Sequence, residues 1–168
     1  CTRHLVELVA DFPHVRVVDT RKTIPGLRLF QKYAVRVGGG YNHRFNLADA
    51  ILIKDNHIAA CGGIKPAVEK VRAMVPHTMK IEVEVETEEQ VREALAAKAD
   101  IIMLDNMAPE LMAEMVRLIN GQAIVEASGN VSPENIRAIA ASGVDIISAG
   151  MITHSEPALD ISLKISQE

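Results

Sequence analysis

The feature that most constrains the fold is a repeat of strand-like and helix-like segments in the second half of the chain. From residue 80 onward, strand-like runs begin about every 20 to 23 residues, at positions 80, 100, 123 and 145. Segments with helical periodicity lie between these runs. Strands that alternate with helices predict a parallel sheet with the helices packed outside it.

Two earlier strand-like runs bring the expected number of strands to six, fewer than the eight of a closed TIM barrel. We therefore expect an α/β fold, an incomplete or open TIM-like (β/α) barrel with parallel strands and outer helices. A doubly wound open sheet is the alternative. Both architectures bind ligands at the carboxyl ends of their strands. The expected strands are 15–19, 50–55, 80–86, 100–105, 123–128 and 145–150.

Local signals predict where two of the helices begin. Thr87 and Gln90 form a capping box ahead of an apolar-periodic segment. Ser132 is expected to be the N-cap of a helix that starts at Pro133. The segment 20–49 has little regular periodicity, so we expect loops with short helices that build a binding site.

The length and composition indicate a single globular domain. A chain of 168 residues with 48% apolar residues can bury a core of its own. No apolar run reaches the roughly 18 residues that a membrane span needs. Two cysteines, Cys1 and Cys61, do not make a disulfide framework, which favours a reducing cytoplasm. We expect residues 1–168 to be one domain in the cytoplasm.

The net charge of −4 conceals an asymmetry along the chain. Residues 1–65 hold ten Lys/Arg and five Asp/Glu, whereas residues 66–168 hold eight and seventeen. The acidic remainder argues against a nucleic-acid binder, which would present a broad basic surface. A local positive region suits a small, highly charged anion instead.

The positive charge gathers in residues 19–57. A basic cluster within a packed domain is costly unless an anion meets it. The alternative is a solvated basic face. Glycines and histidines interrupt the charges, which favours loops around a site. The basic residues of this stretch are Arg21, Lys22, Arg28, Lys32, Arg36, Arg44 and Lys54.

The strand-like run 80–86 reads KIEVEVE and alternates acidic with apolar residues. Because successive strand residues face opposite sides, Glu82, Glu84 and Glu86 should share one face. If Val83 and Val85 pack beneath helices, the three carboxylates point into the barrel and need cationic partners. An edge strand with a solvated acidic face is the alternative.

Further candidate site residues stand at or just after the ends of later strands. Asp105 could hold Mg²⁺ together with Glu84, hold ribose hydroxyls, or cap the following helix. Small-residue loops at strand ends bind phosphate through backbone N–H groups, although glycine turns are common there. The residues of these loops are Ser128, Gly129, Asn130 and Gly150.

His43 beside Arg44 could act as a general acid or base, but the surrounding cations favour a hydrogen-bond donor to a ligand carboxylate. His57 and His154 are expected to be structural. The sequence lacks CxxC and HExxH patterns, so no zinc site is expected. It also lacks the glycine signatures of the common nucleotide-binding folds.

A set of ordered motifs resembles one known family. DTRKT-PGLR, KYAV, GGG-NHR, LIKDNH, EVEVE, IIMLDNM, EASGN and GVDIISAG resemble, in order and spacing, the catalytic barrel of the quinolinate phosphoribosyltransferase family. Members are also called nicotinate-nucleotide pyrophosphorylases (carboxylating). The resemblance extends from about residue 12 to about residue 163.

The resemblance implies a pentosyltransferase that converts quinolinate and phosphoribosyl pyrophosphate (PRPP) to nicotinate mononucleotide, pyrophosphate and CO₂, in NAD biosynthesis. A transferase of the same fold with another substrate, or an inactive fragment acting as an assembly module, are the alternatives. By the resemblance, quinolinate binds to Arg21, His43, Arg44 and Lys54. The catalytic residues are Lys22, Glu84 and Asp105, and phosphate binds to Ser128, Gly129, Asn130 and Gly150.

The resemblance also implies Mg²⁺ held by Glu84 and Asp105, directly or through water. It implies that an N-terminal domain precedes this segment in the longer chain, and that the longer chain forms a homodimer or higher homo-oligomer. Neither nucleic acid nor membrane is an expected partner. The interleaved basic loops predict a geometry as well. Arg21, Lys22, Arg44 and Lys54 should converge on one cavity at the carboxyl ends of the strands, and Glu84 and Asp105 should line the same cavity.

Overall fold

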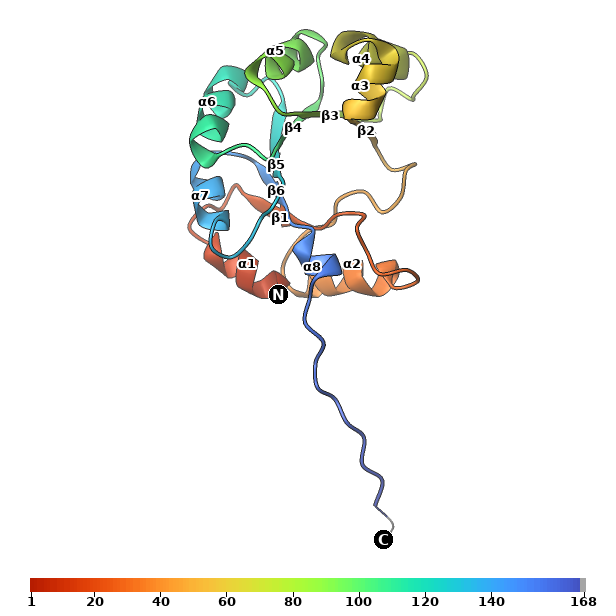
Figure 1. Cartoon of the computed structure of the whole chain (residues 1–168), viewed down its shortest axis with the longest axis vertical. Coiled ribbons are helices and arrows are strands. Elements are labelled where there is room, and N and C mark those ends of the chain that lie inside the picture. The colour runs from red at the N-terminus through yellow and green to blue at the C-terminus, as the bar shows by residue number, and fades with distance from the viewer. Residues whose placement is uncertain (167–168) are drawn as a thin grey trace.

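The computed structural model describes residues 1–166 and is an open α/β barrel (Figure 1). Six parallel strands form one sheet in the order β1-β6-β5-β4-β3-β2. All six expected strands and the expected fold class are therefore confirmed. The strands are β1 (Arg16–Val18), β2 (Ile51–Ile53), β3 (Ile81–Val85), β4 (Ile101–Asp105), β5 (Ile124–Ser128) and β6 (Ile146–Ser148).

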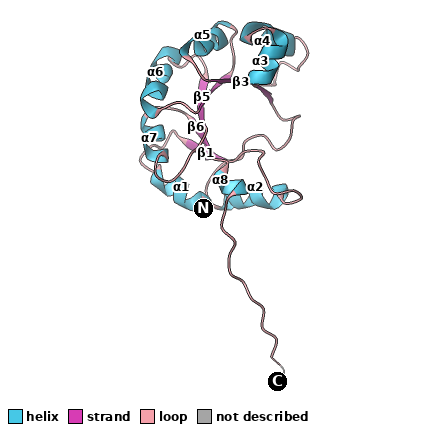
Figure 2. Ribbon diagram, viewed as in Figure 1, coloured by secondary structure: helices cyan, strands magenta, loops and turns pink. Residues whose placement is uncertain are grey.

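Helices cover the outer face of the curved sheet (Figure 2). The capping box of Thr87 and Gln90 is present at the start of α5, as predicted. The helices are α1 (Thr2–Leu8), α2 (Arg28–Val37), α3 (Asp55–Cys61), α4 (Ile64–Arg72), α5 (Glu88–Ala96), α6 (Pro109–Ile119), α7 (Ile136–Ala141) and α8 (Met151–His154).

The alternation of strand residues separates an apolar outer layer from a polar interior. Val83 and Val85 of β3 are buried in the core that the helices cover, as are Ile102 and Leu104 of β4. Their neighbours along each strand face the barrel interior, where a cavity is lined by Glu84, Met103, Asp105, Glu126, Ser128 and Ser148. This period of two makes the barrel interior the chemically active side.

The barrel is open because β1 and β2 do not pair with each other. Beyond β1, the chain that leaves α2 makes one isolated parallel bridge, between Val18 and Tyr41. Residues 38–50 then lead to β2 on the other side of the opening (Figure 1). The segment 20–49 thus combines loops with a ten-residue helix, α2, and places residues from it beside the barrel interior.

Two local predictions were wrong. The helix expected from Pro133 begins at Ile136, because residues 133–135 form a turn in which the Ser132 carbonyl accepts the N–H groups of Asn135 and Ile136. Glu86 does not point into the barrel. It lies one residue past β3, where the chain turns toward α5, and it is exposed.

The surface of α2 carries a row of exposed apolar side chains. Leu29, Phe30, Tyr33 and Val37 are each more than 60% exposed. After α8, residues 156–166 run away from the barrel as an extended segment (Figure 1). Within residues 1–166, no helix combines the length and apolar character that a bilayer span requires.

Candidate active site

A cavity of about 880 Å³ lies at the carboxyl ends of the strands and contains every residue predicted for the site. The predicted convergence of basic and acidic side chains is therefore confirmed, while their individual roles stay predictions. The cavity is lined by Arg21, Lys22, His43, Arg44, Lys54, Glu84, Asp105, Ser128, Gly129, Asn130 and Gly150.

Two guanidinium groups occupy the same side of this cavity. Partial burial lowers the pKa of Arg44, and the positive charge of Arg21 lowers it further. The Arg44 Nη1 donates to the Ala50 carbonyl at 3.1 Å, while the buried Nε of Arg21 has no partner in the described chain. Neighbouring cations with an unused donor indicate a place for an anion.

An acidic side of the cavity faces these cations. Lys54, the N-cap of α3, forms an ion pair with Glu84 of β3. Asp105 is the last residue of β4 and accepts the Asn106 amide at 2.8 Å. Glu84 belongs to β3, and Lys54 directly follows β2, the parallel strand beside it. This pairing explains why residues thirty positions apart in sequence meet.

The loop after β5 is held in a fixed shape by asparagines. Gly129 has φ +96, and Asn106 and Asn130 also adopt the left-handed region, with φ of 52 and 47. The Asn130 amide donates to Asn106 Oδ1 at 3.1 Å, and the Asn106 N–H donates to the Ser128 carbonyl at 2.9 Å. The loop does not adjoin a helix start, since α7 begins only at Ile136.

Gly150 lies at the neighbouring strand end and directly precedes α8. A Cβ atom at this position would lie 2.8 Å from His154 Nε2 and 3.7 Å from Lys22 Cδ, so both side chains approach the glycine closely. The Thr153 hydroxyl donates to the Lys22 carbonyl at 2.7 Å. Segments 131 residues apart in sequence therefore form one wall of the cavity.

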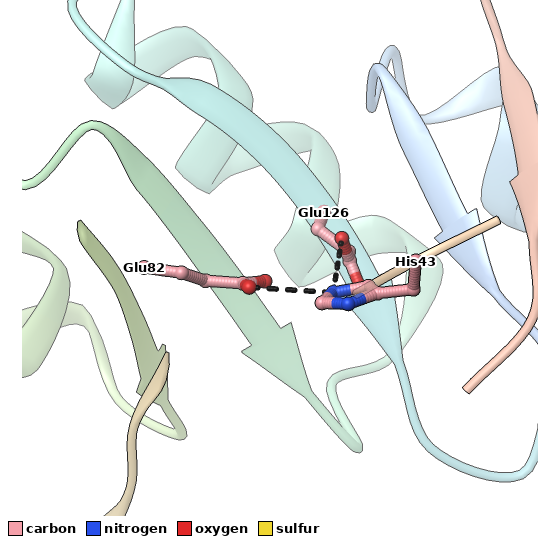
Figure 3. A group of neighbouring side chains, drawn as sticks. All are labelled: His43, Glu82 and Glu126. Carbon is pink, nitrogen blue, oxygen red and sulfur yellow. Dashed lines mark ion pairs between the residues drawn. The ribbon is translucent and has the colours of Figure 1, made fainter. Parts of the chain in front are cut away.

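His43 reaches into the barrel interior between two buried carboxylates (Figure 3). Its Nε2 lies 3.3 Å from Glu82 and 3.5 Å from Glu126. Burial lowers the pKa of His43, but hydrogen bonds and charges from Glu126 and Glu82 outweigh it and raise the pKa to about 10. In the neutral form of the ring, the Arg44 N–H donates to Nδ1 at 2.8 Å.

His43, Glu82 and Glu126 are also the one group of three potential metal ligands within residues 1–166. The Arg44 N–H occupies the lone pair of Nδ1, which puts the ring proton of the neutral form on Nε2, facing the carboxylates. A metal at Nε2 would have to replace that proton. Hydrogen bonding within this group therefore explains its geometry better than coordination does.

Sequence reasoning did not place Glu126 or His154 at the cavity, and it wrongly expected Glu86 to point into the barrel. Glu126 and Ser128 are two residues apart on β5, so the period of two could have identified Glu126. His154 was expected to be structural, yet it lines the cavity. Its position depends on the short helix α8, which no periodicity in the sequence indicates.

The fold and the site together define a class of protein. An open parallel α/β barrel carries, at the carboxyl ends of its strands, one cavity with clustered guanidinium groups, paired carboxylates and two glycine-containing loops. This is the arrangement of an α/β-barrel enzyme domain, whose active site lies at that end of the strands.

Comparison with known proteins identifies the family. The quinolinate phosphoribosyl transferase C-terminal domain family matches residues 1–164, and the chain belongs to it. A probable nicotinate-nucleotide pyrophosphorylase (carboxylating) from Bacillus subtilis is 51% identical over 165 residues, covering 98% of this chain and 57% of the relative. The chloroplastic nicotinate-nucleotide pyrophosphorylase of Arabidopsis thaliana is 46% identical, with 98% and 53% covered.

Solved structures agree with this assignment. NadC from Streptococcus pyogenes superimposes with a TM-score of 0.90 at 50% identity, covering 97% of this chain and 57% of that protein. The nicotinate-nucleotide pyrophosphorylase of Francisella tularensis gives a TM-score of 0.87 at 49% identity, with 91% and 54% covered. The chain thus spans a little more than half the length of the relatives that it matches.

Proposed function

We propose that this domain carries the active site of a nicotinate-nucleotide pyrophosphorylase (carboxylating), a pentosyltransferase. The protein would convert quinolinate and PRPP to nicotinate mononucleotide, pyrophosphate and CO₂ in NAD biosynthesis. Relatives at about 50% identity carry this name. The observation that supports it most directly is the cavity itself, which gathers Arg21, Arg44 and Lys54 together with Glu84 and Asp105.

The cationic side suits the dicarboxylate substrate. Guanidinium groups form paired hydrogen bonds with planar carboxylates, and Arg21 retains an unused buried Nε–H for such a ligand. We propose a different role for His43 from the one that the resemblance implies, because its Nε2 already faces Glu82 and Glu126. We infer that Arg21, Arg44 and Lys54 bind quinolinate, with His43 as part of the wall behind them.

The acidic side suits the sugar donor. As pyrophosphate leaves, positive charge develops on the ribose, and we propose that Glu84 and Asp105, which line the cavity, stabilise it. The pyridine nitrogen then attacks the anomeric carbon. After the nitrogen has become quaternary, the 2-carboxyl group departs as CO₂, and its bonding electron pair stays on C2, which takes up a proton from water. Lys22 and the loops at 128–130 and 150 would bind the phosphates.

Mg²⁺ is part of the same proposal. Glu84 and Asp105 line the cavity, but the Lys54 ion pair occupies one oxygen of Glu84. Two carboxylates, one of them partly engaged, fit an ion that keeps waters and takes its other ligands from substrate phosphates. When bound there, Mg²⁺ would neutralise charge on the departing pyrophosphate.

A coupled assay of the full-length protein tests the function. Quinolinate with PRPP should give nicotinate mononucleotide and CO₂, whereas nicotinate in place of quinolinate should give little product. Turnover of another acceptor in preference to quinolinate would instead favour the related transferase. Absence of turnover with every acceptor would favour the other alternative, in which this domain is inactive and acts only as an assembly module.

Replacing Arg44 by alanine should weaken quinolinate binding while the barrel stays folded. The change removes a charged hydrogen-bond donor from a hydrated cavity, and the loss of such a partner typically costs about 1.5–3 kcal/mol. Calorimetry with quinolinate measures the effect, and Arg72→Ala, which lies outside the cavity, is the control. Unchanged quinolinate affinity in Arg44→Ala would refute the assignment.

We further propose that the full-length protein is a homodimer or higher homo-oligomer located in the cytoplasm. The exposed apolar side chains of α2 support this proposal, because such a row is typical of a surface that another part of the assembly covers. These side chains are Leu29, Phe30, Tyr33 and Val37. Sedimentation of the full-length protein should give at least the mass of a dimer. Phe30→Glu with Tyr33→Glu should shift it toward monomer, and a monomeric parent would contradict this prediction.

A further inference from the structure

A fully buried ion pair lies next to the cavity but outside it. Asp19, directly after β1, is 0% exposed, and Lys32 of α2 is 2% exposed. Their side chains meet at 2.5 Å between Lys32 Nζ and Asp19 Oδ1. Neither residue lines the cavity, so neither can contact a ligand there.

The pair forms hydrogen bonds with both the backbone N–H and the backbone carbonyl of a single residue, His43. The His43 N–H donates to Asp19 Oδ1 at 2.9 Å, and Lys32 Nζ donates to the His43 carbonyl at 3.0 Å. Asn42 completes the network, since its amide donates to Asp19 Oδ2 at 2.6 Å and to the Lys32 carbonyl at 2.9 Å. Residues 42 and 43 are thereby fixed to the end of β1 and to α2.

Residues 42–44, the segment held in this way, belong to neither a strand nor a helix. Among residues 1–166, a single β-bridge, between Val18 and Tyr41, connects this segment to β1, and the opening of the barrel lies on its other side. From this segment the His43 ring extends to Glu82 and Glu126 (Figure 3). The Arg44 side chain, from the same segment, lines the cavity. The directions of both side chains therefore depend on the backbone at 42–44.

An ion pair is a poor way to stabilise a core. Removing two charges from water costs several kcal/mol per ion, and well-packed apolar residues of similar volume are often as stable or more stable. Apolar replacements could not donate to the His43 carbonyl or accept its N–H. The structure is thus better explained by a need to orient this backbone than by a need for stability.

We propose that Asp19 and Lys32 are positioning residues for the quinolinate side of the active site. Their buried pair clamps the backbone of His43 and so sets the direction in which Arg44 enters the cavity. This inference rests on the proposed function, and it assigns to the pair a role in substrate affinity that a merely structural ion pair would not have.

The test compares Lys32→Met with the parent in the full-length protein. Misplacing Arg44 should raise the KM for quinolinate about 100-fold, because small errors in position are that costly. The KM for PRPP should change much less, since Glu84 belongs to β3 and Asp105 to β4, and the Lys22 carbonyl accepts a hydrogen bond from Thr153 of α8. Met115→Ala, which removes a buried side chain of α6 far from the segment, is the matched control for lost stability.

Amide hydrogen exchange gives a second readout that does not depend on the substrate. In Lys32→Met the exchange rates of the amides of residues 42–44 should rise above those in the parent, and by a larger factor than the rates elsewhere in the barrel. In Met115→Ala the amides of 42–44 should not stand out in this way. Should Lys32→Met fail to fold, Asp19→Asn removes the charge while keeping an acceptor for the His43 N–H, and it should raise the same KM by a smaller factor.

Each outcome decides between separate claims. If the folded variant keeps the parent's KM for quinolinate and its exchange at 42–44, the positioning role is overturned. If both KM values rise together, or if Met115→Ala shows the same split, the pair acts through general stability and the proposal also fails. If the parent does not bind quinolinate, the proposed function is wrong, and hydrogen exchange still tests the clamp.

Discussion

Gly129→Ala should lower kcat/KM for PRPP by about 100-fold or more while the rest of the barrel stays folded. Gly129 has φ +96, a conformation that costs a residue with a side chain about 1–3 kcal/mol. A Cβ atom there would lie 2.2 Å from Asn106 Oδ1 and 2.8 Å from the Asn106 backbone nitrogen. The loop and Asn106 must therefore move apart.

That movement would disrupt the part of the cavity proposed to bind phosphate. Asn106 Oδ1 accepts a hydrogen bond from the Asn130 side-chain amide, and the Asn106 backbone N–H donates to the Ser128 carbonyl. Both ends of the loop therefore depend on the position of Asn106. Asp105, the adjacent residue, would shift with it. Because the damage lies on the sugar-donor side, quinolinate binding in calorimetry should change little.

A second glycine provides the matched control. Gly121 also has a positive φ, of +73, but a Cβ atom there would have nothing within 4 Å. Gly121→Ala should therefore show the backbone cost, about 1 kcal/mol, without loss of activity. If Gly129→Ala and Gly121→Ala were equally active with PRPP, the loop at 128–130 would not be the phosphate site.

The sequence was most informative where local pattern and chemistry coincide. The period of two in KIEVEVE placed Val83 and Val85 against the helices and Glu84 in the cavity, because neighbouring strands on both sides impose the alternation. The same rule failed at Glu86. A strand's alternation ends with its pairing, and β3 stops one residue earlier, at Val85.

The parts that could not be predicted depend on contacts between distant segments. Nothing local to Lys32 distinguishes it from the other basic residues of 19–57, yet it is buried against Asp19 while most of them line the cavity or lie near the surface. His43 likewise meets Glu82 and Glu126 only because the barrel brings β3 and β5 to its side. A single sequence states which residues are charged, but not which pairs the topology joins.

The second large effect concerns Glu84. Glu84→Gln should lower kcat about 100- to 1000-fold, because it removes the carboxylate that we propose stabilises positive charge on the ribose in the transition state. Glutamine keeps the size and the hydrogen-bonding carbonyl of the side chain, so the barrel should fold normally. Glu86→Gln is the matched control, since Glu86 lies two residues away, is exposed and is outside the cavity.

The ion pair with Lys54 adds a second expected result for Glu84→Gln. The kcat should fall, whereas the affinity for quinolinate should stay the same or rise. Lys54 is paired with Glu84, and its side chain is 45% exposed against 15% for Glu84. Glu84→Gln releases the ammonium group for the quinolinate carboxylates, so calorimetry should show quinolinate binding as tightly as in the parent or more tightly. Lys54→Met should instead weaken quinolinate binding roughly 10- to 100-fold, the equivalent of about 1.5–3 kcal/mol.

These two variants together separate the acidic from the basic side of the cavity. Single-turnover measurements with both substrates saturating would locate the Glu84→Gln defect in the chemical step. If Glu84→Gln weakened quinolinate binding and left kcat unchanged, Glu84 would act by orienting Lys54. Its assignment to the ribose and to Mg²⁺ would then be wrong, and Asp105 alone would remain as the carboxylate for the sugar donor.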